Sequence, residues 1–264
     1  MTASEMIQAG DLAGARGALA EAVRRAPADP AARFALAEVL ILLGEWERAD
    51  THLDLASSQD PSWGALVALQ RQLVRAAKHR EEVFTAGRSP DLVTAPSPAV
   101  ETALRILLEA RTGADAAAMR EAADAEAPDL TGVCDGRTFT TLRDGDDRTA
   151  DVLELLTSTG KYVWAGWSEV ASLELRPVER PRDLAWRAAE LELRDGPSGV
   201  VYLPMTYEAP AAELTDALRL GRETGWTERG GLACGLGQRC LLIGEELVPF
   251  ATVRALSVSA VEPG

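Results

Sequence analysis

The sequence predicts an α+β protein with two domains, a helical array over residues 1–130 and a β-rich domain over residues 131–264. Three observations predict this fold class. The first half repeats itself at a helical spacing, the second half contains short alternating apolar runs bounded by glycine and proline, and the composition shifts after Pro128. At 264 residues, 47% of them hydrophobic, the chain is long enough for two domains.

The repeat in the first half has an offset of 34 residues, which aligns AGDLAGARGALAEAVRRAP (9–27) with LGEWERADTHLDLASSQDP (43–61). We expect Gly10 and Gly44 at the turns between helices, and Pro27 and Pro61 just beyond helix ends. This offset is the period of the tetratricopeptide repeat, a helix–turn–helix unit. The first half is therefore interpreted as a tetratricopeptide-like array.

The rest of the first half extends this array. PAARFALAEVLILLG (30–44) supplies the first helix of the second unit, and SWGALVALQRQLVRAAKHREEVF (62–84) predicts a long helix that ends near Gly87. Three prolines in the nine residues 90–98 predict an extended connector. Residues 100–128 return to helical spacing, and we interpret them as a degenerate helical pair that closes the bundle.

Stacked helical pairs form a concave face that can hold an extended peptide or an amphipathic helix. The candidate partner-binding face lies opposite the apolar stripe of Leu36, Ala37, Leu40 and Leu43. Its residues are Phe34, Glu38, Ile41 and Leu42, with Gln72 and Arg75 from the next helix. The alternative is that Phe34 and Ile41 pack against the following unit or the connector, as apolar residues on helices usually do.

The second half predicts a small barrel or SH3-like sheet with one or two short helices. ADVLELLTSTG (150–160) predicts a short helix, and AAELTDALRLGRE (211–223) predicts another. The strands and hairpins are expected in VASLELRPVE (170–179), AAELELRDGPSGVVYLP (188–204) and GQRCLLIGEELVPFATVRALSV (237–258).

An internal sequence similarity in this half, called the aromatic echo below, indicates the role of its clustered aromatic residues. GWSEVASLELRPVE (166–179) aligns with PFATVRALSVSAVE (249–262), which places Trp167 over Phe250. Both copies predict a turn that leads into a strand. Because a small sheet needs large rings to fill its interior, Tyr162, Trp164 and Trp167 are predicted as core residues and not as a ligand platform.

Composition and charge exclude several classes of function. The net charge of -14 repels nucleic acid and anionic lipid, so neither is expected as a partner. The sequence contains no apolar run of the roughly 20 residues that a membrane helix needs, and MTASEMIQAGDL does not resemble a secretory signal. Three cysteines are too few and too irregular for a disulfide framework. We therefore expect a cytoplasmic protein.

The sequence offers no catalytic set, metal site or cofactor motif. His52 and His79 are interpreted as surface or packed residues, and GGLACGLGQRC (230–240) as hairpin backbone that needs positive φ. The acidic run 144–147 begins like a calcium loop, but the required glycine and glutamate are absent, which favours a solvated turn. An enzyme whose site lies in the β-rich half stays open as a hypothesis, with polar candidates Asp144, Asp146, Arg148 and Arg239.

Short motifs follow one another along nearly the whole chain: GDLAGARGAL, GEWERA, VFTAGRSP, DGRTFTTLRDGDDR, ADVLELL, GKYVW, RPRDLAW, VYLPMTY, LRLGRETGWTE and GLGQRCLL. In their order and spacing they resemble the ImpE/TagJ family of type VI secretion accessory proteins. The chain departs from the family pattern at Ala150-Asp151, where Gly-Pro is usual, and at Trp164 to Trp167, where Trp-Val-Pro-Phe is usual.

The resemblance implies a cytoplasmic, non-enzymatic adaptor of the type VI secretion machine. Its implied partners are the small subunit of the contractile sheath, bound through an amphipathic helix, and the AAA+ ATPase that disassembles the sheath. No cofactor is implied. The alternative, which depends on the repeat alone, is a general tetratricopeptide-like scaffold for peptides that is unrelated to secretion.

Overall fold

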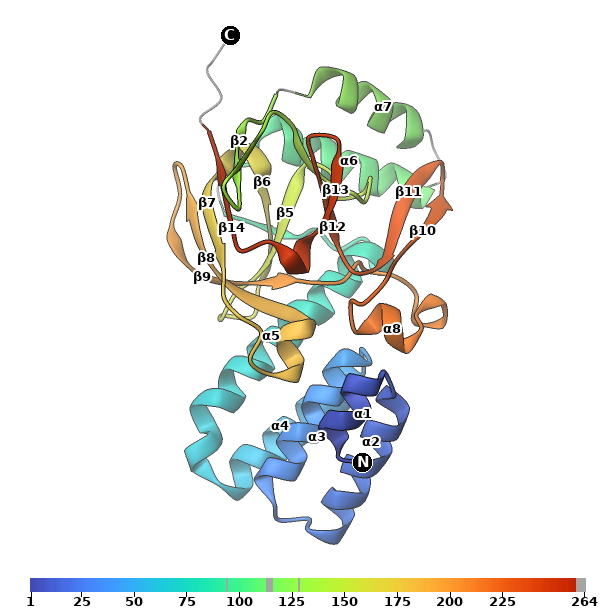
Figure 1. The fold of residues 1–264 in the computed structure, drawn as a ribbon, viewed down its shortest axis with the longest axis vertical. Helices are drawn as coiled ribbons and strands as arrows, with labels where there is room; N and C mark the ends of the chain where they lie inside the picture. Colours follow the sequence, from blue (N-terminus) through green and yellow to red (C-terminus); the bar gives the residue numbers. More distant parts are fainter. Residues whose placement is uncertain (94, 113–115, 128, 260–264) are drawn as a thin grey trace.

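The computed structural model describes residues 1–93, 95–112, 116–127 and 129–259. It has a helical layer formed by the first part of the chain and a β-rich part above it, so the expected two-part α+β fold is confirmed (Figure 1). The helices of the first layer are α1 (Ala3–Ala9), α2 (Leu12–Arg25), α3 (Pro30–Leu42), α4 (Trp46–Gln59) and α5 (Gly64–Ala86), with the 3-10 turn η1 (Pro61–Trp63) before α5.

The turns of the helical layer lie where the repeat predicts them. Gly10 and Gly44 adopt left-handed φ values of 84° and 74°, which a residue with a Cβ adopts only with strain. α2 ends two residues before Pro27, and α4 ends two residues before Pro61. The long helix α5 ends at Gly87, as predicted.

The β-rich part contains a nine-stranded sheet in the order β1-β6-β5-β9-β8-β7-β14-β2-β3, with a three-stranded sheet β13-β12-β4 and the hairpin β10-β11 beside it. Within the nine-stranded sheet, β1 and β6 are parallel and the other neighbours are antiparallel. The strands are β1 (Asp91–Leu92), β2 (Gly132–Cys134), β3 (Arg137–Phe139), β4 (Leu142–Asp144), β5 (Val152–Leu156), β6 (Tyr162–Gly166), β7 (Val170–Leu175), β8 (Trp186–Leu193), β9 (Ser198–Pro204), β10 (Thr224–Arg229), β11 (Leu232–Gly237), β12 (Cys240–Ile243), β13 (Glu246–Pro249) and β14 (Ala255–Val258).

The helix expected over residues 150–160 is wrong, because this segment forms β5. All five residues of β5 are buried, and the strand pairs with β6 and β9. A short apolar run that is buried on both faces has no alternation, so its periodicity cannot distinguish a strand from a helix. The second expected helix is shorter than predicted and consists of the turn η4 (Ala211–Glu213) and α8 (Asp216–Arg219).

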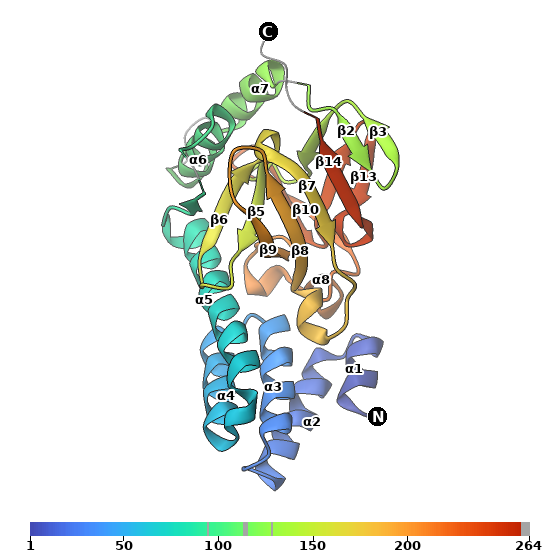
Figure 2. The same ribbon diagram turned by 90° about the vertical axis from the view of Figure 1, so that its left-hand side faces the viewer.

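The helical pair α6 (Pro98–Thr112) and α7 (Ala116–Glu126) forms as expected but does not close the bundle. The connector before it adds β1 to the edge of the sheet, which carries the chain past the helical layer. Ile106 and Ala116 then pack with Leu232 and Cys234 of β11. Figure 2 shows α6 and α7 alongside the sheet, while α1 to α4 lie below it.

The aromatic echo is confirmed as a repeated structure. Trp167 begins the turn η2 (Trp167–Glu169) before β7, and Phe250 begins η5 (Phe250–Thr252) before β14. The two strands are antiparallel neighbours, with Leu173 opposite Leu256. Tyr162, Trp164 and Trp167 are at most 1% exposed, so they are core residues as predicted.

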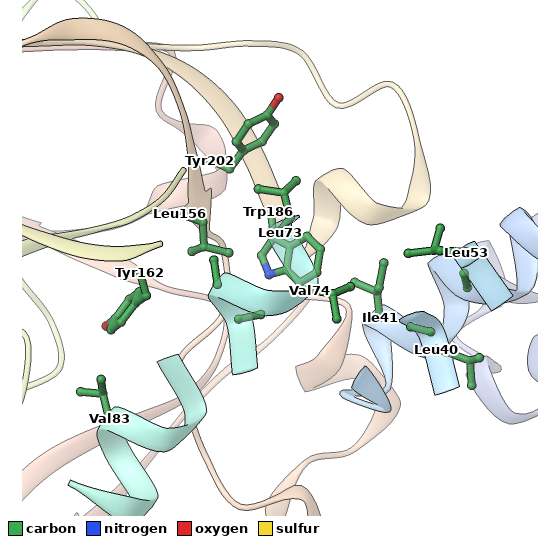
Figure 3. Packing of buried hydrophobic residues seen from close by; sticks show 14 of the residues in the cluster. Leu40, Ile41, Leu53, Leu73, Val74, Val83, Leu156, Tyr162, Trp186 and Tyr202 are labelled. Atoms are coloured by element: carbon green, nitrogen blue, oxygen red, sulfur yellow. The ribbon is translucent and has the colours of Figure 1, made fainter. Parts of the chain in front are cut away.

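One hydrophobic core crosses from the helices to the sheet. Ile41 and Val74 of the helical layer belong to the same buried cluster as Leu156 and Trp186 of the sheet (Figure 3). The rings of Trp46 and Trp186 stack with their centroids 5.8 Å apart. This core therefore contains residues from both sides of residue 130.

Candidate functional site

The face expected to bind a partner is covered by the chain's own C-terminal half. Phe34, Glu38, Ile41 and Leu42 are between 1% and 8% exposed. The turn η3 (Pro181–Leu184) packs on α3.

Each apolar residue of this face has a partner inside the protein. The Phe34 ring lies 5.3 Å from that of Trp63 in the following unit, and Leu42 packs with Leu220. Ile41 belongs to the core shared with the sheet. The expectation of an open groove at these residues is thus corrected. Phe34 packs against the following unit, as the alternative expected, whereas Ile41 and Leu42 share cores with the second half of the chain.

Gln72 and Arg75 lie apart from the other four predicted residues. They are on the part of α5 that faces the turn between β5 and β6, where a Cβ at Gly160 would lie 2.4 Å from the Gln72 Oε1 atom. The Arg75 Nη1 atom donates a hydrogen bond of 2.8 Å to the same Oε1 atom. These two side chains therefore contribute to packing between α5 and the sheet.

The structure contains a cleft of about 380 Å³ where the helical layer meets the β-rich part. This volume lies within the range of roughly 300 to 1,000 Å³ typical of binding pockets. Its walls come from the turn between α3 and α4, from α5 and α6, and from the segment that connects β9 to α8. The large apolar side chains that line it are Trp46, Phe84, Leu107, Trp186, Leu214 and Leu218.

Arg80, Arg148 and Glu208 form the polar floor of this cleft. Arg80 binds Glu154 in a bidentate ion pair of 2.6 and 3.1 Å and contacts Glu208 at 3.2 Å. Arg148 pairs with Asp146 and donates a bond of 2.9 Å to the carbonyl oxygen of Glu208.

Both guanidinium groups lie over the ring of Phe84, at 5.6 and 4.9 Å from its centroid. Cation–π contacts of this kind hold an aromatic ring in one orientation. Phe84 is thus a preformed part of the cleft wall.

The floor belongs to a larger buried ion network. Arg239 is fully buried, pairs with Asp144 and contacts the Glu154 Oε2 atom at 3.2 Å. The hydroxyl of Tyr162 donates to Glu154.

Burial alone would raise the pKa of Glu154, but Arg80 and Arg239 outweigh it and lower that pKa to about 2. Burial dominates at Glu208 and raises the pKa of that carboxyl group. The carboxylate of Glu154 therefore stays ionised in the interior at neutral pH.

The acidic run 144–147 is not the solvated turn that its composition suggested. Asp144 and Asp146 are at most 1% exposed, and Asp146 also accepts a hydrogen bond of 2.8 Å from the Gly235 amide. They are buried because Arg148, two residues after Asp146, and Arg239, from the segment before β12, provide compensating charge. Sequence reasoning missed Arg80, Glu154 and Glu208, and among them only Glu154 carried a signal, as a charge inside the apolar run VLELL.

The four polar residues of the enzyme hypothesis are brought together, but as ion pairs. Of these four, Arg148 lines the cleft. Cys234 also lines it, but burial raises the pKa of its thiol to about 11, which disfavours the nucleophilic thiolate at neutral pH. Within the described ranges, no group of three or more His, Cys, Asp or Glu residues could hold a metal ion, and no helix could cross a membrane.

Known proteins resemble this chain over most of its length. The ImpE protein family matches residues 136–257, and the tetratricopeptide repeat family matches residues 6–73. The type VI secretion system accessory component TagJ of Pseudomonas aeruginosa is 34% identical over 232 residues, which cover 87% of this chain and 82% of TagJ. The chain belongs to the ImpE family.

This ImpE-family chain also resembles a solved structure. The X-ray crystal structure of a Vibrio parahaemolyticus protein matches it with a TM-score of 0.89 and 25% sequence identity, over 98% of both chains. The resemblance inferred from the ordered motifs is confirmed. The two matched families fall on opposite sides of the cleft, because residues 6–73 include the turn between α3 and α4 and residues 136–257 include α8.

Proposed function

We propose that this ImpE-family protein is a cytoplasmic, non-enzymatic adaptor of the type VI secretion machine. It binds the small subunit of the contractile sheath through an amphipathic helix and assists the link between the sheath and its AAA+ disassembly ATPase. The similarity to TagJ, a type VI accessory component, supports the assignment to this machine. The observation that carries the adaptor role is the apolar cleft between the repeat helices and the β-rich part.

The chemistry of the cleft favours binding over catalysis. Its carboxylate neighbours Glu154 and Asp146 are already bound by guanidinium groups, and its walls are mostly apolar. A preformed apolar pocket beside fixed charges suits the capture of side chains from a helix. The repeat helices thus contribute one wall of the site.

Direct binding to purified sheath small subunit tests this proposal. We expect saturable binding in biolayer interferometry, weakened at least tenfold by Phe84→Ser, because Phe84 forms a wall of the cleft. Leu108→Ser is the matched control, since Leu108 is 56% exposed on α6 and does not line the cleft. Both variants are first checked for a wild-type circular dichroism spectrum.

Two results would contradict the proposal. One is the absence of binding to both the sheath subunit and the ATPase at tens of micromolar protein. The other is equal binding of unrelated amphipathic helices, which would favour the general peptide-binding scaffold.

A further inference from the structure

We propose that the cleft selects an acidic amphipathic segment, whose apolar side chains enter beside Phe84 and Trp46 while its carboxylates pair with Arg111 at the rim. This inference rests on the proposed adaptor function, because it specifies the chemistry of the segment that the adaptor receives. Two observations support the inference together: the positive charge at the rim of the cleft and its apolar walls.

The described residues that line the cleft include more arginines than acidic residues, although the whole chain is acidic. The chain carries a net charge of -14, yet the described residues that line the cleft include five arginines and two glutamates. Both glutamates are engaged: Glu81 accepts a hydrogen bond of 2.6 Å from the Trp46 indole, and Glu208 contacts Arg80. Arg80, Arg148 and Arg229 are paired with carboxylates, so the lining cations without an ion pair to a described residue, Arg111 and Arg219, are the ones that would attract an anionic partner.

The arginines of the cleft differ in whether they already have an ion pair or a hydrogen bond within the protein. Arg80 and Arg148 hold buried carboxylates, and Arg219 donates to the carbonyl oxygens of Leu43 and Ala211. Arg229 pairs with Glu213.

Arg111, by contrast, is exposed at the end of α6 and makes no ion pair with another described residue. Its guanidinium packs against Gly87, and it can pair with a partner without first breaking an ion pair to a described residue.

The apolar walls restrict the partner further. The guanidinium groups stacked over Phe84 hold its ring in place, and stacking on Trp186 does the same for Trp46. A preformed pocket of about 380 Å³ has room for a few side chains but not for a whole folded element. The partner thus inserts one apolar edge and leaves its charged positions at the rim.

The test uses the full chain and three fluorescein-labelled helical peptides with leucines at positions i, i+3, i+4 and i+7. Their flanking positions carry glutamate, glutamine or lysine. In fluorescence anisotropy we expect the glutamate peptide to bind at least tenfold more tightly than the glutamine peptide at low salt. The difference should shrink at high salt, because exposed ion pairs are screened. Equal affinity for the three peptides would overturn the inference.

Two charge reversals on α6 locate the selectivity. Arg111→Glu should reduce the preference for the glutamate peptide at least fivefold and improve binding of the lysine peptide. Arg105→Glu is the matched control, because Arg105 is exposed on the same helix but does not line the cleft. Equal behaviour of the two variants would overturn the role of the cleft.

The same variants separate this inference from the proposed function. If the sheath subunit binds wild type and both variants equally while the glutamate peptide does not bind, the inference fails and the adaptor function stands. If the glutamate peptide binds in an Arg111-dependent way and the sheath subunit does not bind, the adaptor function fails and the acidic selectivity of the cleft stands.

Discussion

At the scale of single residues, Glu154 holds together the interior where helix and sheet meet. Its carboxylate lies in a buried strand and binds Arg80 from α5 and Arg239 from the segment before β12. The Tyr162 hydroxyl donates to it, and the Trp164 indole donates to that hydroxyl at 2.6 Å. A buried charge is tolerated when ion pairs and hydrogen bonds satisfy it on all sides. Removal of one partner leaves an uncompensated charge in the interior, which is costly.

We therefore expect Glu154→Gln to lower the free energy of unfolding by about 3 kcal/mol or more, because two buried guanidinium groups lose a shared countercharge. Urea denaturation followed by circular dichroism measures the change. Glu174→Gln is the matched control, since Glu174 is exposed on β7, and it should change the free energy by less than about 0.5 kcal/mol. Equal effects of the two substitutions would show that the buried network contributes nothing.

At the scale of elements, the contact between α3 and η3 buries a carboxyl group without a hydrogen bond. The Glu38 Oε1 atom has no hydrogen-bond partner and lies 4.0 Å from the Arg180 Nε atom. Burial raises the pKa of Glu38 to about 7, although Arg180 and Arg182 oppose the shift. This group is therefore protonated in the folded protein over a pH range in which it is ionised in the unfolded chain.

The sign of the pH dependence follows from that raised pKa. Between about pH 4.5 and pH 7 the folded state binds the proton more tightly, so the stability contributed by Glu38 is present below pH 4.5 and lost as pH rises to 7. The loss amounts to about 3 kcal/mol for a shift of this size. Glu38→Gln should remove this pH-dependent loss of stability, because glutamine does not ionise. The free energy of unfolding of the variant should therefore rise relative to that of wild type as pH increases.

Urea midpoints measured from pH 5 to pH 8 check this expectation. An exposed glutamate on α7 provides the control, and Glu121→Gln should follow the wild-type profile. Parallel profiles for Glu38→Gln and wild type would show that the α3 to η3 contact does not hold a protonated carboxyl group.

Elements also differ in how well their patterns predicted them. Helices α2 to α5 were predictable because their turns and ends are marked by Gly10, Gly44, Pro27 and Pro61. β5 was not, because its apolar run lacks the alternation of a half-buried strand. The four candidate residues on α3 are covered by other segments of the chain, which a local pattern cannot predict.

At the scale of the whole molecule, one hydrophobic core is shared between the two halves. Leu73 and Val74 pack in the same cluster as Tyr162 and Trp186. Contacts at the surface add to this core: the Asp216 carboxylate accepts a bond of 2.9 Å from the Leu12 amide. Separating the halves would expose these apolar residues to water.

We expect urea to unfold the protein in one transition. Far-ultraviolet circular dichroism reports mainly on the helical layer, and tryptophan fluorescence reports mainly on the β-rich part, where Trp164, Trp167 and Trp186 are buried. The midpoints of the two signals should coincide, because neither half keeps its core without the other. Two separated midpoints would contradict this expectation and indicate independently stable domains.

The sequence by itself determined the repeat, its turns, the ends of its helices and the aromatic residues that begin the turns before β7 and β14, because each depends on neighbours a few residues away. Only the tertiary structure decided that α3 is covered and that a cleft opens between the halves. It also brought Arg80 to Glu154, 74 residues along the chain, and Asp144 to Arg239, 95 residues away. Short sequence patterns determine local backbone conformation, whereas burial and ion pairing depend on which distant segments meet when the chain folds.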